Sequence, residues 1–190
     1  MKISGFSLIE VMITSFILAL ALLGLAGMQS TAVKSTIEIQ QRTLANSLLA
    51  DIGERMLLNR LWLQKAGNNY AVDSLMKADL SAPGCIGTGG TFDNCSGEDV
   101  KNNDLYEWKK KFLGAHTISD SGINTGLIAA DACIEVASSG VSTIILSWFS
   151  TVKSKDAAAE LDSESLAYKC GEASASRRQL RVEVFTGKPL

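Results

Sequence analysis

The amino-acid sequence predicts an α+β fold, in which one long N-terminal helix packs on a small antiparallel sheet of about three to four strands. Residues 11–33 contain no charged side chain, and residues 34–63 place apolar side chains on one helical face. Three short segments in the C-terminal part of the chain alternate between apolar and polar side chains, as half-buried strands do. Because no proline precedes Pro83, nothing in the N-terminal part of the chain forces a helix to break.

The charge-free segment from Val11 to Val33 is long enough to cross a membrane. At about 1.5 Å per residue, its helix would exceed the hydrocarbon core of roughly 30 Å. Lys2 precedes it, and the positive-inside tendency places that end in the cytoplasm and the rest of the chain outside. A cleaved secretory signal is the main alternative, but the apolar run is longer than an ordinary signal core and the helical pattern continues after it.

The second half of the predicted helix is amphipathic. Its apolar positions share one helical face at steps of seven and four: Ile37, Leu44, Leu48, Ile52 and Met56. We therefore predict one helix from about Phe6 to about Leu63, apolar on all sides in its first half and along one stripe in its second half.

The cysteines all lie beyond this helix, at Cys85, Cys95, Cys133 and Cys170. An even number in a segment that follows a membrane-targeting sequence predicts disulfides in an oxidising compartment, whereas reduced core thiols are the alternative. Four cysteines allow three pairings. We favour Cys85–Cys95, which are close in the sequence, together with Cys133–Cys170.

The alternating segments predict an antiparallel meander. They are Cys133–Val136, Ser142–Thr151 and Arg181–Phe185. A turn at 138–140 joins the first two strands, and the apolar side chains of the sheet are expected to face the stripe of the long helix. The polar excursion 153–176 separates the last two strands, and a bridge from Cys133 to Cys170 would tie it to the sheet.

Residues 67–103 are expected to form loops with short helical pieces. Asp104 is then expected to cap a short helix that carries Trp108 and Phe112 on one side. An oxygen-rich cluster could bind calcium, but its spacing matches no EF-hand loop and a solvated acidic loop is favoured. Its members are Asp93, Asn94, Glu98, Asp99 and Asp104. Lys109–Lys111 could bind phosphate, but adjacent helical residues point to different sides, so a solvated face is favoured.

No catalytic constellation is present in the sequence. The single histidine, His116, lies in a loop-like stretch, and the chain has no nucleophile elbow, zincin motif or zinc-spaced Cys/His set. We therefore expect neither catalysis nor a metal or other cofactor. The formal net charge of −2 gives no general attraction to nucleic acid, so a nucleic-acid partner is not expected.

The stretch GFSLIEV resembles the start of type IV pilins, in which glycine, an aromatic residue and an acid precede an apolar helix. Here these residues are Gly5, Phe6 and Glu10. The resemblance implies a pilin-like fold and removal of a leader by prepilin peptidase between Gly5 and Phe6, followed by N-methylation of Phe6. It also implies the following organisation: leader 1–5, transmembrane and assembly helix 6–33, amphipathic half of the helix 34–63, and periplasmic or extracellular globular domain 64–190.

Glu10 is the one carboxylate at the start of the apolar run, and a lone charge within hydrocarbon usually has a partner or a role. We expect Glu10 to set the axial register of packed subunits by attracting the amine of Phe6 on a neighbouring chain. The simpler alternative is that Glu10 lies at the cytoplasmic interface and reaches water.

The stretch QRTLANSLLADIGERMLLNR at residues 41–60 is similar to the second half of the helix in PilV-type minor pilins. This resemblance implies a subunit that helps to initiate type IV pilus assembly and supports motility and adhesion. The implied partners are other minor pilins, the major pilin, prepilin peptidase/methyltransferase and the inner-membrane assembly platform.

One departure from the family also favours a minor subunit. Many major pilins carry a proline in the apolar half of the helix, where this chain has only Gly24 and Gly27. The alternatives left open are a pseudopilin of a type II secretion system and, from another class, a surface adhesin or DNA-binding pilin.

Overall fold

The computed structural model describes residues 7–85, 94–114 and 126–187. The chain forms two units, Met1–Ile39 and Gln40–Leu190, and each is described by itself. The first unit is helical throughout its described part from Leu8 onward. The second unit contains the sheet and the remaining helices.

Helix α1 spans Leu8–Leu58 and is followed after Asn59 by the short helix α2, Arg60–Leu63. The predicted helix is therefore interrupted at one residue. At this residue the Asn59 side-chain amide donates hydrogen bonds to the Tyr70 hydroxyl at 3.0 Å and to the Gly97 carbonyl at 2.7 Å. These bonds connect the end of α1 to two later segments of the second unit.

The sheet is the predicted antiparallel meander. Its strands are β1 (Asp131–Val136), β2 (Val141–Phe149) and β3 (Arg177–Phe185), in the order β1-β2-β3. Gly140 adopts a φ of 83° in the turn between β1 and β2, a conformation that glycine accepts readily. The short helices η1 (Ala157–Glu160) and α4 (Leu166–Lys169) lie in the excursion between β2 and β3.

Strand β3 begins four residues before the predicted start at Arg181, since Arg177 already pairs with Phe149 of β2. The alternation of apolar and polar side chains did not predict this earlier start, because polar side chains occupy the first three positions of the strand. Leu180, Val182 and Val184 share one face of β3, as expected, and pack against the main core.

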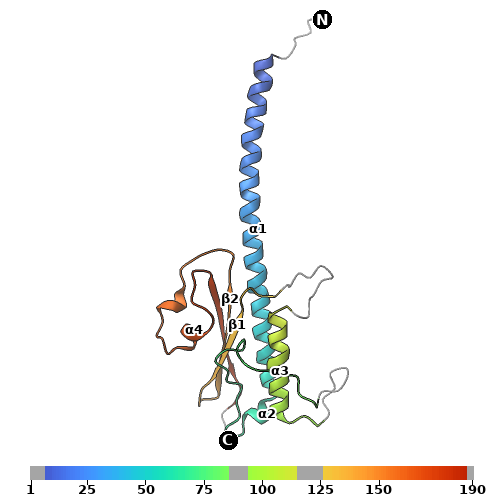
Figure 1. Cartoon of the computed structure of the whole chain (residues 1–190), viewed down its shortest axis with the longest axis vertical. Coiled ribbons are helices and arrows are strands. Elements are labelled where there is room, and N and C mark those ends of the chain that lie inside the picture. The colour runs from blue at the N-terminus through green and yellow to red at the C-terminus, as the bar shows by residue number, and fades with distance from the viewer. Residues whose placement is uncertain (1–6, 86–93, 115–125, 188–190) are drawn as a thin grey trace. The chain divides into compact units, whose positions relative to one another are not determined.

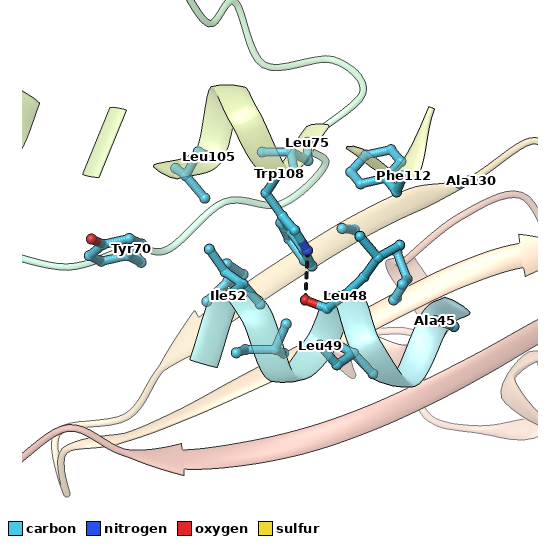
Figure 2. Close-up of a cluster of buried hydrophobic side chains, with 14 of the residues drawn as sticks. Ala45, Leu48, Leu49, Ile52, Tyr70, Leu75, Leu105, Trp108, Phe112 and Ala130 are labelled. Carbon is cyan, nitrogen blue, oxygen red and sulfur yellow. Dashed lines mark hydrogen bonds between the residues drawn. The ribbon is translucent and has the colours of Figure 1, made fainter. Parts of the chain in front are cut away.

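The core lies where the second half of α1 meets α3 (Gly97–Phe112) and the sheet (Figure 1). Trp108 is fully buried at its centre, and its indole nitrogen donates a hydrogen bond to the Leu48 carbonyl at 2.9 Å (Figure 2). Gly53 allows β3 to approach α1 closely, because a Cβ at this position would lie 3.2 Å from Val184 Cγ2. A glycine that is unfavourable for the isolated helix therefore serves the packing of the sheet.

The start of α3 corrects one prediction. Asp104 was expected to cap a short helix, but α3 begins at Gly97, and Ser96 and Asp99 form a capping box at its N-terminus. Asp104 instead lies in the middle of α3 and is only 4% exposed. The serine cap signal was present in the sequence at the end of the turn-rich loop.

A polar network surrounds Asp104 inside the second unit. Its carboxylate accepts hydrogen bonds from Arg55 Nη1 at 3.0 Å and from the Tyr70 hydroxyl at 2.8 Å. Burial raises the pKa of Asp104, although the bonds from Tyr70 and Arg55 act in the opposite direction. Burial and the nearby Asp104 charge also raise the pKa of Tyr70 well above its usual range. The network thus joins α1, α3 and the segment between them.

Two disulfides are present, in the favoured pairing. Cys85 is bonded to Cys95, and Cys133 of β1 is bonded to Cys170 at the end of α4. Cys133 and Cys170 are both fully buried in a small cluster with Ile145, to the side of the main core. This second bridge fixes the excursion 153–176 to the sheet.

We expect the Cys133–Cys170 bridge to stabilise the fold more than the Cys85–Cys95 bridge. Their sequence separations are 37 and 10 residues, and the chain-entropy model gives about 4 and about 3 kcal/mol for loops of these sizes. The double variants Cys133→Ala/Cys170→Ala and Cys85→Ala/Cys95→Ala, compared by denaturant unfolding of the full chain in detergent, measure the difference. A larger loss of stability in the second variant would contradict this expectation.

The substitution Asp104→Asn should reduce the free energy of unfolding by about 1–3 kcal/mol, because one amide oxygen cannot serve both Arg55 and Tyr70 as a carboxylate does. The matched control is Glu54→Gln, which neutralises an exposed carboxylate on α1 and should change stability by less than about 0.5 kcal/mol. Denaturant midpoints of the two variants give the comparison. Equal effects would show that the network does not stabilise the fold.

Candidate functional site

The first unit offers the most unusual surface of the described chain. Every residue from Ser7 to Thr36 is exposed, although the segment is predominantly apolar. Leu8 is 78% exposed, Phe16 65% and Leu23 70%. An apolar helix of this kind requires an apolar environment, which can be a bilayer or the helices of other chains.

The described chain has one helix that is long and apolar enough to cross a membrane, and it is α1. The charge-free part from Val11 to Val33 is helical over its whole length. It continues without interruption through Gly24 and Gly27, where a Cβ would meet no neighbour within 4 Å. The segment is therefore one continuous apolar helix.

Three hydroxyl side chains of this segment form hydrogen bonds within the helix. Thr14 Oγ1 donates to the Val11 carbonyl at 3.0 Å, and Ser15 Oγ donates to the Met12 carbonyl at 2.9 Å. Thr31 makes a similar bond to the Gly27 carbonyl at 3.3 Å. Because these groups need no water, they are compatible with burial in hydrocarbon.

Glu10 lies in the first turn of α1, where its backbone N–H donates to the Ser7 carbonyl at 3.0 Å. A carboxylate at a helix N-terminus interacts favourably with the helix dipole. Among the described residues, no side-chain partner of Glu10 is present, so its charge is available to a group outside them. Gly5 and Phe6, the expected cleavage and methylation positions, lie outside the described residues.

Several residues between positions 41 and 60 contribute to the packing of the second unit. The apolar residues Ala45, Leu49 and Met56 are buried in the core. Asp51 accepts a hydrogen bond from Arg55 Nε at 3.2 Å within the helix, as side chains four residues apart can. The buried apolar residues, and Arg55 through its bond to Asp104, attach α1 to the rest of the second unit.

The lysines of α3 are engaged within the second unit. Lys109 Nζ donates to the carbonyls of Met76 and Ala78 at 3.1 and 3.0 Å, and Lys111 Nζ donates to Asp51 at 2.9 Å. Lys110 lies 3.5 Å from Glu107. As expected for consecutive helical residues, they point to different partners and form no single cationic patch.

The remaining sequence candidates give no further site in the described residues. No group of three or more His, Cys, Asp or Glu side chains there could hold a metal ion. Asp99, from the acidic loop, caps α3. His116 and Asp93 lie outside the described residues.

The sequence analysis did not predict the cluster of cationic side chains at the start of β3. Arg177, Arg178 and Arg181 line a cavity together with the excursion 153–176. The sequence does show the run of arginines before the last strand. It does not show that the excursion folds back over them.

The comparisons with known proteins give one match. Residues 1–26 match the family model of the prokaryotic N-terminal methylation motif. No curated protein and no solved structure matches the chain.

The matched motif includes Gly5, Phe6 and Glu10, and it indicates a type IV pilin-like or pseudopilin-like protein. Such proteins are structural rather than enzymatic, and prepilin peptidase processing and pilus assembly form their context. The motif and the apolar helix together support membrane anchoring. The N-terminal methylation motif, the long apolar helix and the antiparallel sheet therefore support a place for this chain in the type IV pilin-like family.

Proposed function

We propose that this chain is a PilV-type minor pilin that helps to initiate type IV pilus assembly and forms part of the pilus tip or priming complex. It would thereby support pilus-dependent motility and adhesion. The observation that carries the proposal is the exposed apolar part of α1, from Leu8 to Thr36, with a single carboxylate, Glu10, in its first turn. The similarity of residues 41–60 to PilV-type proteins supports the choice of a minor subunit.

Before assembly, the chain would lie in the inner membrane with its N-terminus in the cytoplasm and its globular domain in the periplasm. The two disulfides of the second unit agree with an oxidising compartment. Prepilin peptidase would remove residues 1–5 and methylate Phe6. The assembly platform would then transfer the apolar helix from lipid to a bundle of similar helices, which is again an apolar environment.

Glu10 would guide this transfer. The new N-terminus at Phe6 carries a positive amine, and Glu10 of a neighbouring subunit carries the opposite charge. Attraction between these charges is much stronger in an apolar surrounding than in water. A helix that is apolar on all sides can slide against its neighbours at little cost, so a single charge pair would fix the axial register.

A priming complex would lower the barrier to filament nucleation. The first subunits must lose translational and rotational freedom before lateral contacts offset the free energy lost in this way. A set of minor pilins that holds this register in advance would supply a template for the next subunit. Other minor pilins and the major pilin are the proposed partners, all contacted through α1.

The first experiment deletes the gene and then counts surface pili by electron microscopy while secreted proteins are assayed in parallel. Loss of pili with normal secretion supports the minor pilin. Retention of pili with loss of secretion would instead identify a pseudopilin of a type II secretion system, which shares the N-terminal chemistry. A strain that keeps both would contradict an assembly role altogether.

The substitution Glu10→Ala should reduce incorporation into surface filaments by at least about tenfold, because a charge pair in an apolar environment contributes more than 1.4 kcal/mol. Leader removal should remain normal, since the cleavage position is unchanged. Immunoblots of sheared filaments and of membranes measure the two quantities.

Two further variants make the test specific. Glu10→Gln keeps the shape but removes the charge, so it should behave as Glu10→Ala does. Glu54→Ala removes a carboxylate from the second half of α1 and should incorporate normally. Normal incorporation of Glu10→Ala would disprove the register role, whereas failure of Glu54→Ala would point to a general loss of helix stability.

A further inference from the structure

The second unit contains a cavity of about 430 Å³ between the excursion 153–176 and the sheet. Ile145 of β2 and three arginines of β3 contribute to its lining from the sheet. Ala158, Leu161 and Ala167 contribute apolar side chains from the excursion. The volume lies within the range of about 300–1,000 Å³ that is typical of sites for small molecules.

The charged residues of the lining are mostly cationic. They are the four cations Lys155, Arg177, Arg178 and Arg181 and the one carboxylate Asp156. Two exposed acids lie next to the lining, since Glu160 pairs with Lys155 at 2.8 Å and Glu183 pairs with Arg181 at 2.6 Å. Among these described residues, four cations lie beside three acids. Exposed ion pairs are weak, so an incoming anion can replace such partners.

Arg177 is held rigidly at this cavity. Its Nε donates to Asp156 at 3.1 Å, and its Nη1 donates to the carbonyls of Tyr168, Cys170 and Gly171 at 3.2–3.3 Å. The side chain is only 1% exposed, and Nη2 has no hydrogen-bond partner among the described residues. An unsatisfied buried guanidinium N–H is costly, and an oxygen from a ligand or a bridging water would satisfy it.

The cavity is preformed by features of the fold rather than by loops alone. The Cys133–Cys170 disulfide fixes the excursion to the sheet. Leu166 and Ala167 pack against the buried cluster that these two cysteines form with Ile145. Gln179 of β3 donates its amide to the carbonyls of Ala167 and Cys170 at 2.9 and 2.7 Å. A preformed site loses little conformational entropy when it binds a ligand.

We propose that this cavity binds a hydroxylated carboxylic acid of monosaccharide size, such as a uronic or sialic acid. The cationic side chains would bind the carboxylate, and hydroxyl groups would reach the remaining polar groups, including the Gln179 carbonyl oxygen. The apolar side of the cavity would contact the less polar face of the sugar. Cationic side chains from two separate segments, the excursion and β3, line one cavity of about 430 Å³. A volume of this size suits a ligand with oxygens around a small ring better than an extended acidic peptide.

The test measures binding to the purified full chain in a nonionic detergent, by calorimetry and saturation-transfer NMR. The probes are D-glucuronic acid, N-acetylneuraminic acid and, as the neutral control, D-glucose. At least one acid should bind and glucose should not, and added salt should weaken the binding. An oligosaccharide with the bound acid at its terminus distinguishes a glycan from the free sugar as the source of the ligand.

The variant Lys155→Gln/Arg181→Gln should weaken binding of that acid by at least about tenfold. Both side chains are largely exposed, at 74% and 61%, so the substitutions should leave the thermal unfolding temperature unchanged. Lys153→Gln is the matched control, because Lys153 is an exposed lysine of the same excursion that does not line the cavity. It should bind as the unaltered chain does.

Several results would overturn the proposal. They are absence of binding by both acids at about 10 mM, equal binding of glucose, and an equal loss of binding in Lys153→Gln. Tighter binding of an acidic peptide than of either sugar would assign the cavity to a different class of ligand. None of these measurements requires a filament, so the result is independent of the proposed assembly function.

Discussion

Burial of one stripe of α1 is the constraint on which the second unit depends. Ala45, Leu49, Ile52 and Met56 are each at most 4% exposed, and they meet both α3 and the sheet. The leucine, isoleucine and methionine side chains each contribute about 1.5–3 kcal/mol when removed from water. Neither the sheet, with three strands, nor α3 could bury its apolar side alone, so each requires this stripe.

The polar positions of the same helix complete the attachment. Asp51, Arg55 and Asn59 lie between the buried positions and bind Lys111, Asp104 and Tyr70 of later segments. The buried and hydrogen-bonded positions between residues 41 and 60 therefore have a structural role in attaching α1 to the later segments of the second unit. The exposed positions of the same stretch, such as Asn46 and Glu54, have no such role among the described residues.

The sequence predicted the helix and the meander because both produce a strong hydrophobic period. It predicted less well where polar side chains are buried. Asp104 resembles a helix cap in the sequence but lies inside the network of Arg55 and Tyr70, and Arg177 resembles a loop residue but begins β3. In both cases the partner is distant in the sequence, so no local period could reveal the burial. The same reason explains why the cationic cavity was missed, whereas Glu10 stood out because nothing near it carries charge.

The chain therefore uses its apolar residues in two different ways. From Gln40 onward the stripe is covered by the chain's own α3 and sheet, whereas from Ser7 to Thr36 no residue of the first unit is buried. The globular domain does not need that segment for its core, and the segment cannot satisfy its apolar surface by itself. Lipid or the helices of other chains can provide an apolar environment for it, and either can replace the other because both are apolar. What lipid cannot supply is a fixed axial position, and this is the property that a single carboxylate in the first turn can add.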